Sequence, residues 1–151
     1  MWLLRHGEAE PHGARPDDER ALTERGREQS RAAGRALAAA EVLFHTVYTS
    51  PKVRARDTAA LACGALGCEP VVHEPLRAGF TVDDLPELVL GGEDERILLV
   101  GHEPDLSQLV YDLTGARIDM KKGGVAGIRM EGARRGELIV LLRPRELARI
   151  V

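Results

Sequence analysis

Aromatic residues are scarce in this chain of 151 residues, which contains two Phe, two Tyr and one Trp. Nucleic-acid-binding proteins commonly stack bases on aromatic side chains and carry a basic surface. This chain has few aromatic rings, and its net charge is -3. We therefore expect no nucleic-acid partner.

Cysteines and long apolar runs are also scarce. Cys63 and Cys68 are too few for a disulfide framework, and their spacing fits neither a redox pair nor a zinc site, so we expect ordinary thiols at a helix end. No segment approaches the roughly 20 apolar residues that span a bilayer, and a strand predicted from Met1 leaves no room for a signal peptide. These observations predict a cytoplasmic protein with no membrane partner.

The bulk composition is that of a folded domain. Hydrophobic residues make up 44% of the chain and charged residues 30%, which is typical of globular proteins. The length is that of one domain and is sufficient for a core of ordinary size. We predict a single domain over residues 1–151.

Apolar runs alternate with helix signals along the chain. Strands are predicted in residues 1–4, 42–49, 69–73, 97–100, 125–130 and 138–142. One helix is predicted from the cap Thr23 to about Ala40. A second has Ser50 as its cap and Pro51 as its first residue, and ends near Gly64 or Gly67. A third runs from Pro104 to Thr114 with Gly115 as the stop, and one helical turn is predicted around residues 85–90.

This alternation predicts an α/β fold: one three-layer α/β/α domain with a mostly parallel central sheet. The last two strands are expected to close the sheet as an antiparallel hairpin through residues 131–136. Residues 11–20 are polar and contain two prolines and a glycine, which indicates a mobile loop.

Three segments place arginine or histidine directly after a predicted strand. Arg5 and His6 follow the first strand, Arg54 lies in the first turn after the second, and His102 follows residues 97–100. Ligands bind beyond the carboxyl ends of the strands in such sheets. The four side chains are therefore expected to converge at one edge.

These residue types suit phosphoryl transfer. A histidine with one neutral, exposed ring nitrogen can accept a phosphoryl group, and His6 is the candidate nucleophile. Arginine forks match the phosphoryl oxygens, so Arg5 and Arg54 would form a clamp. His102, if protonated, would add a third cationic donor, and the N-terminus of the helix at Pro51 would add N–H groups. This chemistry needs neither a metal nor another cofactor.

The motifs together resemble the histidine phosphatase superfamily, also called phosphoglycerate mutase-like. They are Arg5-His6-Gly7, Leu22-Thr23-x-x-Gly26, Ser50-Pro51-x-x-Arg54-Ala55-x-x-Thr58 and Gly101-His102. The resemblance runs from Met1 to the last strand and implies the phosphoglycerate mutase-like fold. It also implies a phosphohistidine intermediate on His6, a phosphoryl group bound by Arg5, Gly7, Arg54 and His102, and hydrolysis by water.

Two departures point to the smallest branch of that family. Larger relatives insert a helical cap that supplies a glutamate as proton donor, whereas residues 73–96 are too short for one and Ala78 stands at that glutamate's place. An open site without an acid resembles SixA-type phosphohistidine phosphatases, because a neutral imidazole leaves without a delivered proton. The expected partner is therefore a protein that carries phosphohistidine.

Several alternatives stay open. The pocket would equally suit a phosphatase for small phosphomonoesters, such as sugar or nucleotide phosphates. A non-catalytic module that binds phosphorylated ligands is less favoured, because such a module would not need the candidate nucleophile His6. A mutase is the least favoured enzyme, because it needs a closed, water-poor site.

Some charged and histidine residues have no settled role. Glu103 is the foremost candidate proton donor because it adjoins His102, and the other candidates are Glu8, Glu74 and Asp83. A surface or capping role is nevertheless favoured for each of these carboxylates. The basic run of Arg117, Lys121 and Lys122 suits a solvated loop better than a contact with an acidic partner or a path for phosphate. We expect structural or surface roles for the remaining histidines, which are His12, His45 and His73.

Overall fold

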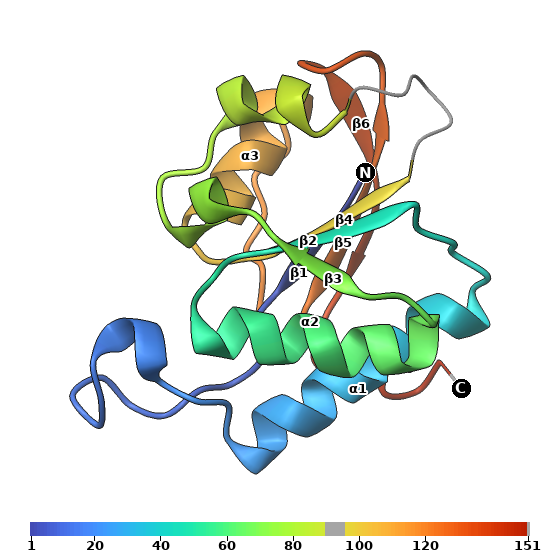
Figure 1. Ribbon diagram of the computed structural model, residues 1–151. Helices are drawn as coiled ribbons and strands as arrows, with labels where there is room; N and C mark the ends of the chain where they lie inside the picture. Colours follow the sequence, from blue (N-terminus) through green and yellow to red (C-terminus); the bar gives the residue numbers. More distant parts are fainter. Residues whose placement is uncertain (90–95, 151) are drawn as a thin grey trace.

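A computed structural model describes residues 1–89 and 96–150 (Figure 1). Its centre is a six-stranded sheet in the order β3-β2-β4-β1-β5-β6. The strands are β1 (Trp2–Arg5), β2 (Thr46–Thr49), β3 (Pro70–Val72), β4 (Ile97–Gly101), β5 (Val125–Met130) and β6 (Gly136–Leu142). The first four are parallel, while β5 pairs antiparallel to β1 and β6 antiparallel to β5. The predicted parallel sheet with its closing hairpin is confirmed.

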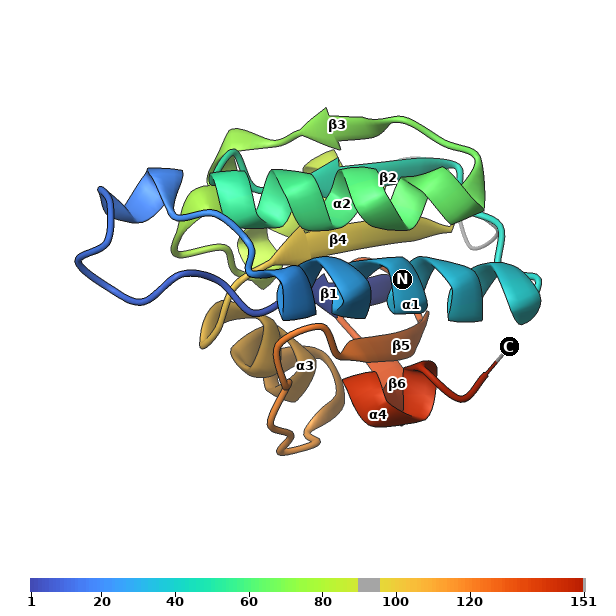
Figure 2. The ribbon, with the colours of Figure 1, turned by 90° about the horizontal axis from the view of Figure 1, so that it is seen from below.

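Helices cover both faces of this sheet (Figures 1 and 2). The α-helices are α1 (Glu24–Ala39), α2 (Val53–Leu66), α3 (Asp105–Thr114) and the short α4 (Pro144–Leu147). The part of the chain that the structure describes also holds three 3₁₀ helices: η1 (Asp17–Glu19), η2 (Glu74–Arg77) and η3 (Val82–Glu87). The core divides accordingly, with α1, α2 and α4 packed on one face and α3, η2 and η3 on the other. This is the predicted three-layer domain.

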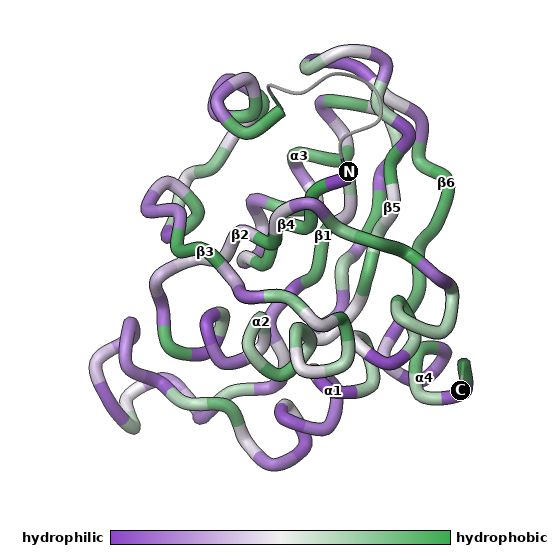
Figure 3. Tube along the Cα trace, turned by 45° about the vertical axis from the view of Figure 1, so that its right-hand side comes forward, coloured by the Kyte–Doolittle hydropathy of each residue, from purple (hydrophilic) through white to green (hydrophobic). Residues whose placement is uncertain are grey.

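The central strands β1 and β4 are buried on both faces. Leu3 and Leu99 pack toward α3, whereas Leu4 and Val100 pack toward α1 and α2. Figure 3 shows these strands as apolar segments inside more hydrophilic turns. Burial on both faces explains why such short runs consist almost wholly of aliphatic residues.

Helices α1 and α2 approach each other closely because their contact is built from small residues. A Cβ added at Gly34 would lie 2.4 Å from the carbonyl oxygen of Ala62. Alanines at helical spacing, such as Ala33 and Ala59, fill the space between these helices and the sheet. Small residues therefore allow the two helices to pack closely on each other and on the sheet.

Most predicted helix ends are found. The Thr23 hydroxyl caps α1 by accepting from the Gly26 N–H at 3.1 Å, and Gly67 and Gly115 end α2 and α3 with φ of 70° and 76°. The predicted start of α2 at Pro51 is wrong by two residues. Lys52 is extended, and its N–H donates to the Ser50 hydroxyl, so that regular helix begins only at Val53.

The connection from β3 to β4 carries no large insertion in its described part. It consists of η2 and η3, and Thr81 caps η3. The turn predicted around residues 85–90 thus begins earlier, at Val82, while residue 90 lies outside the described residues. Among the described helices, none is long and apolar enough to cross a membrane.

Candidate active site

His6 and His102 follow two strands that lie side by side, because β1 and β4 are neighbours in the sheet. Their ring centroids are 5.2 Å apart, and the ring planes are tilted by 52°. The charges of Arg5 and Arg54 both act on His6. The predicted convergence of these four side chains at the carboxyl edge is therefore observed.

The ring of His6 is held in one orientation and one tautomer. Its Nδ1 lies 2.7 Å from the carbonyl oxygen of Gly7. A carbonyl can only accept a hydrogen bond, so Nδ1 must donate and carries the proton. The other nitrogen, Nε2, is left with a free lone pair, as a nucleophilic histidine requires.

Gly7 is a glycine because α1 approaches the chain closely there. A Cβ at Gly7 would lie 2.4 Å from the carbonyl oxygen of Gly26, and one at Gly26 would lie 1.9 Å from that of Glu8. The backbone N–H of Gly7 donates to the Thr58 hydroxyl at 3.1 Å. Both backbone polar atoms of Gly7 have partners within the chain, and its carbonyl orients the His6 ring. The expected contact between Gly7 and a phosphoryl group stays a prediction.

Thr58 joins the segment of His6 to that of Arg54. Its hydroxyl donates to the Arg54 carbonyl at 2.7 Å while it accepts from the N–H of Gly7. Ser30 from α1 lies 3.2 Å from the same oxygen. The sequence motif contained Thr58, but its residue pattern alone assigned it no role.

Arg54 makes contacts that sequence reasoning missed. Its Nη1 donates to the backbone carbonyl of Asp17 at 2.7 Å, and its Nη2 lies 3.3 Å from Oδ2 of the same residue. Lys52 donates to this carboxylate oxygen at 2.8 Å. A carboxylate of the chain thus lies beside the cations predicted to hold a phosphoryl group.

The segment 11–20 is consequently more ordered than its composition predicted. It contains η1, and Arg20 donates to both Asp17 and the carbonyl of Glu10. Asp18 forms an ion pair with Arg77 of η2. The three adjacent acidic residues of η1 were the only signal in the sequence for these long-range pairs.

Arg5 has a different set of partners from Arg54. Its Nη1 donates to the Met120 carbonyl at 2.8 Å, which fixes the guanidinium beside the segment that leads into β5. That segment is bonded to the end of β1, since the N–H of Gly123 donates to the carbonyls of Arg5 and His6. Arg5 and Arg54 therefore reach His6 from different parts of the chain.

His102 is bound through one ring nitrogen. Its Nε2 lies 2.7 Å from the Ser50 hydroxyl oxygen, and that oxygen accepts a hydrogen bond from the N–H of Lys52. Ser50, predicted as a helix cap, instead supports His102 and the turn before α2. The end of β2 thus positions the histidine that follows β4.

Both site histidines are neutral at pH 7. Burial, together with the positive charges of Arg54 and Arg5, lowers the pKa of His6 to about 3. Burial, followed by the neighbouring His6 and Arg54, lowers the pKa of His102 to about 3. His102 is therefore not protonated in these surroundings. A bound dianion would raise the pKa of His102, because a nearby opposite charge favours the protonated ring.

Unpaired buried nitrogens concentrate at this site. Among the described residues, four buried side-chain nitrogens lack a hydrogen-bond partner, and three of them are Nε of Arg5, Nε of Arg54 and Nδ1 of His102. Buried polar atoms are normally satisfied. An anionic ligand with several oxygens is the kind of group that would satisfy them.

The candidate proton donor Glu103 is occupied elsewhere. One of its carboxylate oxygens accepts from the N–H of Ser107 at 2.8 Å and the other from the Ser107 hydroxyl at 2.5 Å. Glu103 thereby caps the first turn of α3. This agrees with the capping role that the sequence analysis favoured over proton donation for Glu103.

The other candidate donors are also paired. Glu8 accepts from Thr23, Glu74 pairs with Arg77, and Asp83 pairs with Arg134. Within residues 1–89 and 96–150, no three His, Cys, Asp or Glu side chains are grouped as metal ligands would be. The metal-free route stays a prediction.

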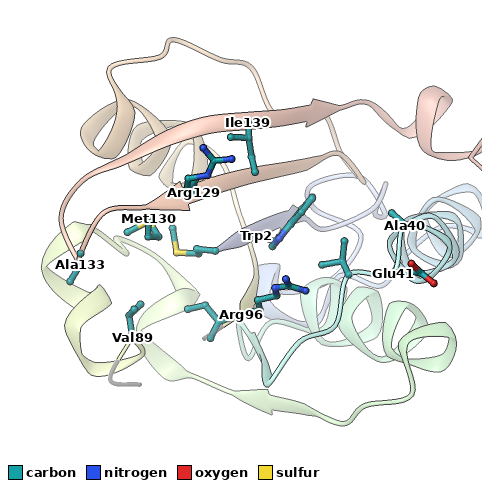
Figure 4. A pocket seen from close by; sticks show the side chains of 13 residues that line it. Trp2, Ala40, Glu41, Val89, Arg96, Arg129, Met130, Ala133 and Ile139 are labelled. Carbon is teal, nitrogen blue, oxygen red and sulfur yellow. The ribbon is translucent and has the colours of Figure 1, made fainter. Parts of the chain in front are cut away.

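One cavity of the molecule lies away from this site. It has a volume of about 670 Å³ and lies at the opposite end of the sheet, lined by Trp2, Arg96, Arg129 and Met130 among others (Figure 4). None of the four converging side chains lines it. Its residues offer no histidine for covalent catalysis.

Comparison with known proteins agrees with the geometry. The sequence model of the histidine phosphatase superfamily (branch 1) matches residues 1–78. An uncharacterized protein of Picosynechococcus sp. is 30% identical, and the match covers 97% of this chain and 98% of that protein.

Solved structures share the fold. The protein histidine phosphatase SixA, complexed with tungstate, has a TM-score of 0.84 at 22% identity, and the match covers 97% of each chain. The phosphoserine phosphatase of Entamoeba histolytica, in complex with 3-phosphoglyceric acid, has a TM-score of 0.72 at 16% identity and covers 97% of this chain and 98% of that one.

Proposed function

Because the chain belongs to the histidine phosphatase superfamily, we propose that it removes phosphate from phosphohistidine on a protein, through a phosphohistidine intermediate on His6. The observation that carries this proposal is the hydrogen bond from Nδ1 of His6 to Gly7. It leaves Nε2 unprotonated, beside two guanidinium groups that suit the charge of a phosphoryl group.

The first step transfers the phosphoryl group to the enzyme. The lone pair on Nε2 of His6 forms the new N–P bond, while the P–N bond of the substrate breaks and its electron pair goes to the substrate imidazole. That ring keeps the proton on its far nitrogen, so it leaves as neutral histidine. Arg5, Arg54 and His102 stabilise the charge on the three phosphoryl oxygens.

The second step repeats the same chemistry with water. Water attacks phosphorus, the P–Nε2 bond breaks, and its electron pair returns to Nε2. The Gly7 carbonyl keeps the proton on Nδ1, so His6 leaves as the neutral ring that began the cycle. Both protons of the water remain on the released dihydrogen phosphate, so this step needs no separate proton donor.

The substrate class is inferred from the proton donors. A phosphate ester would need a proton on its bridging oxygen, yet Glu103 caps α3 and Ala78 stands where larger relatives supply a glutamate. The connection between β3 and β4 is also too short to cover the site with a helical cap. Both features favour an imidazole leaving group presented by another protein.

A phosphatase for small phosphomonoesters is the second candidate, since the phosphoserine phosphatase of Entamoeba histolytica shares the fold. The two are separated by kcat/KM on a phosphohistidine-bearing domain, a phosphoramidate, a sugar phosphate and an aryl phosphate. We expect the phosphohistidine domain to be fastest. A faster sugar phosphate would overturn the proposal and favour the second candidate.

The role of His6 is tested by His6→Ala, with His45→Ala as the matched control. His45 precedes β2 at the opposite end of the sheet, where its Nδ1 accepts from the N–H of Arg96. We expect His6→Ala to abolish turnover and the trapped phosphoenzyme, whereas His45→Ala keeps both. Full activity of His6→Ala would refute the assigned nucleophile.

A further inference from the structure

A second hollow begins at the candidate active site. It has a volume of about 470 Å³ and lies between the end of β1, the start of α1, the segment before β5 and α4. Six of its lining residues are cationic, and one, Glu8, is acidic. We call these cations the basic groove: Arg5, Arg25, Lys121, Lys122, Arg143 and Arg145.

Ion pairs within the protein do not cancel this charge. Arg25 pairs with Glu8 at 3.7 Å, and Lys121 pairs with Asp119 at 2.6 Å. Glu146 pairs with two further arginines, Arg143 at 2.9 Å and Arg145 at 3.1 Å. Three carboxylates thus face six cations in a chain whose net charge is -3.

The groove is continuous with the phosphoryl site. Arg5 belongs to both, since it lines the groove and its charge acts on His6. The positive charge of Lys122 also reaches His6, where it helps to lower the pKa of that ring. Lys121 and Lys122 precede Gly123, whose N–H donates to the carbonyls of Arg5 and His6.

We propose that the basic groove docks an acidic surface segment of the protein whose phosphohistidine enters the site. This inference rests on the proposed function. The sequence pattern favoured a solvated loop for Lys121 and Lys122, whereas the proposal gives these lysines a docking role.

The arrangement of the cations favours a protein segment over a second free phosphate. The cations come from four parts of the chain, and the side chains of Lys121 and Arg145 are 56% and 71% exposed. A site for one small anion would need buried donors that converge on a point. A broad, exposed field instead attracts and orients an extended acidic surface.

The test uses the double variant Lys121→Glu/Arg145→Glu. The control is Arg129→Glu/Arg134→Glu, which changes the charge equally on exposed residues around the β5–β6 hairpin, at the opposite end of the sheet. Steady-state turnover is measured on a phosphohistidine domain with an acidic surface and on a phosphoramidate, at low and high salt. The phosphoramidate carries no surface and reports the integrity of the site.

We expect the groove variant to lose about 10-fold in kcat/KM on the domain at low salt, mainly through KM. Its salt dependence should shrink, and its phosphoramidate turnover should equal that of the wild type. The control variant should resemble the wild type on both substrates.

Two results would overturn the docking inference alone. In the first, wild type and groove variant turn over the domain equally well. In the second, the variant loses as much on phosphoramidate as on the domain, which would assign the groove to the phosphoryl group itself. A wild type slower on the domain than on a sugar phosphate would instead overturn the proposed function, and the inference with it.

Discussion

The hydroxyl of Thr58 accepts a hydrogen bond from the backbone N–H of Gly7, with 3.1 Å between nitrogen and oxygen. The same hydroxyl donates to the carbonyl of Arg54. One fully buried side chain therefore sets the spacing between the segment of His6 and that of Arg54.

Thr58→Val should break this link while it keeps the side-chain shape. We expect a loss of about 1–3 kcal/mol in the free energy of unfolding, because the buried N–H of Gly7 loses its partner, and a fall in kcat of at least about 10-fold. Thr114→Val is the control, since that hydroxyl also donates to a carbonyl one turn earlier but lies in α3. Equal kcat in both variants would contradict the positioning role of Thr58.

Gly7→Ala should be far more harmful than an alanine at an open glycine. The new methyl group would lie 2.4 Å from the carbonyl oxygen of Gly26, so the backbone must move. Gly64→Ala, inside α2 with nothing within 4 Å of its Cβ, should instead stabilise the protein by about 0.5–1 kcal/mol. Thermal unfolding of both variants, with activity assays, checks the contrast, and a Gly7→Ala protein of wild-type activity would refute it.

Acid should destabilise the folded protein below pH 6.5. His6 and His102 titrate near 6.5 when unfolded, but the folded-state pKa of each is about 3. Between these values the unfolded state binds more protons, so stability is complete above pH 6.5 and falls as pH drops toward 3. Each histidine contributes at most about 1.4 kcal/mol per pH unit.

Urea unfolding at pH 7, 6 and 5 measures this slope. The variant His102→Gln should flatten it by up to the contribution of one histidine, while His12→Gln, which removes a side chain that is 87% exposed, should leave it unchanged. A slope that both substitutions leave intact would show that His102 is not the group that titrates.

Removing the charge of Asp17 should strengthen anion binding. Its carboxylate pairs with Lys52 and Arg54, and these pairs lower its pKa, with the hydrogen bond from Lys52 as the main cause. A phosphate near Arg54 is repelled by this carboxylate, so Asp17→Asn should tighten inorganic phosphate about 3- to 10-fold. Calorimetric titration measures the affinity, with Asp112→Asn on α3 as the control; unchanged or weaker binding would argue against the repulsion.

The strands and the site edge were predictable because they depend on local patterns. Short apolar runs are typical of strands that are buried on both faces of a sheet. The buried residues Leu3, Leu4, Leu99 and Val100 belong to two such runs. Once the strands were placed, the topology rule for parallel sheets brought His6 and His102 to one edge. Helix ends at Gly67 and Gly115 followed from glycine's access to positive φ.

The parts that sequence reasoning missed depend on distant partners. Asp17 is ordered by Lys52 and Arg54, which lie more than thirty residues away, so the composition of its own segment indicated only a loop. Ser50 fits a helix cap by residue type, but His102 engages its hydroxyl and α2 begins later. The close approach of Gly26 to Gly7 likewise joins distant segments, and no local pattern indicated it.

The sheet order places β1 and β4, the strands that His6 and His102 follow, at its middle, whereas η1 and α4 lie at the periphery of the molecule (Figure 2). The two histidines are thus anchored to strands whose apolar side chains are buried on both faces, whereas most cations of the basic groove are exposed. Protein engineering can therefore exchange exposed groove residues such as Lys121 and Arg145 while the two buried strands stay unchanged.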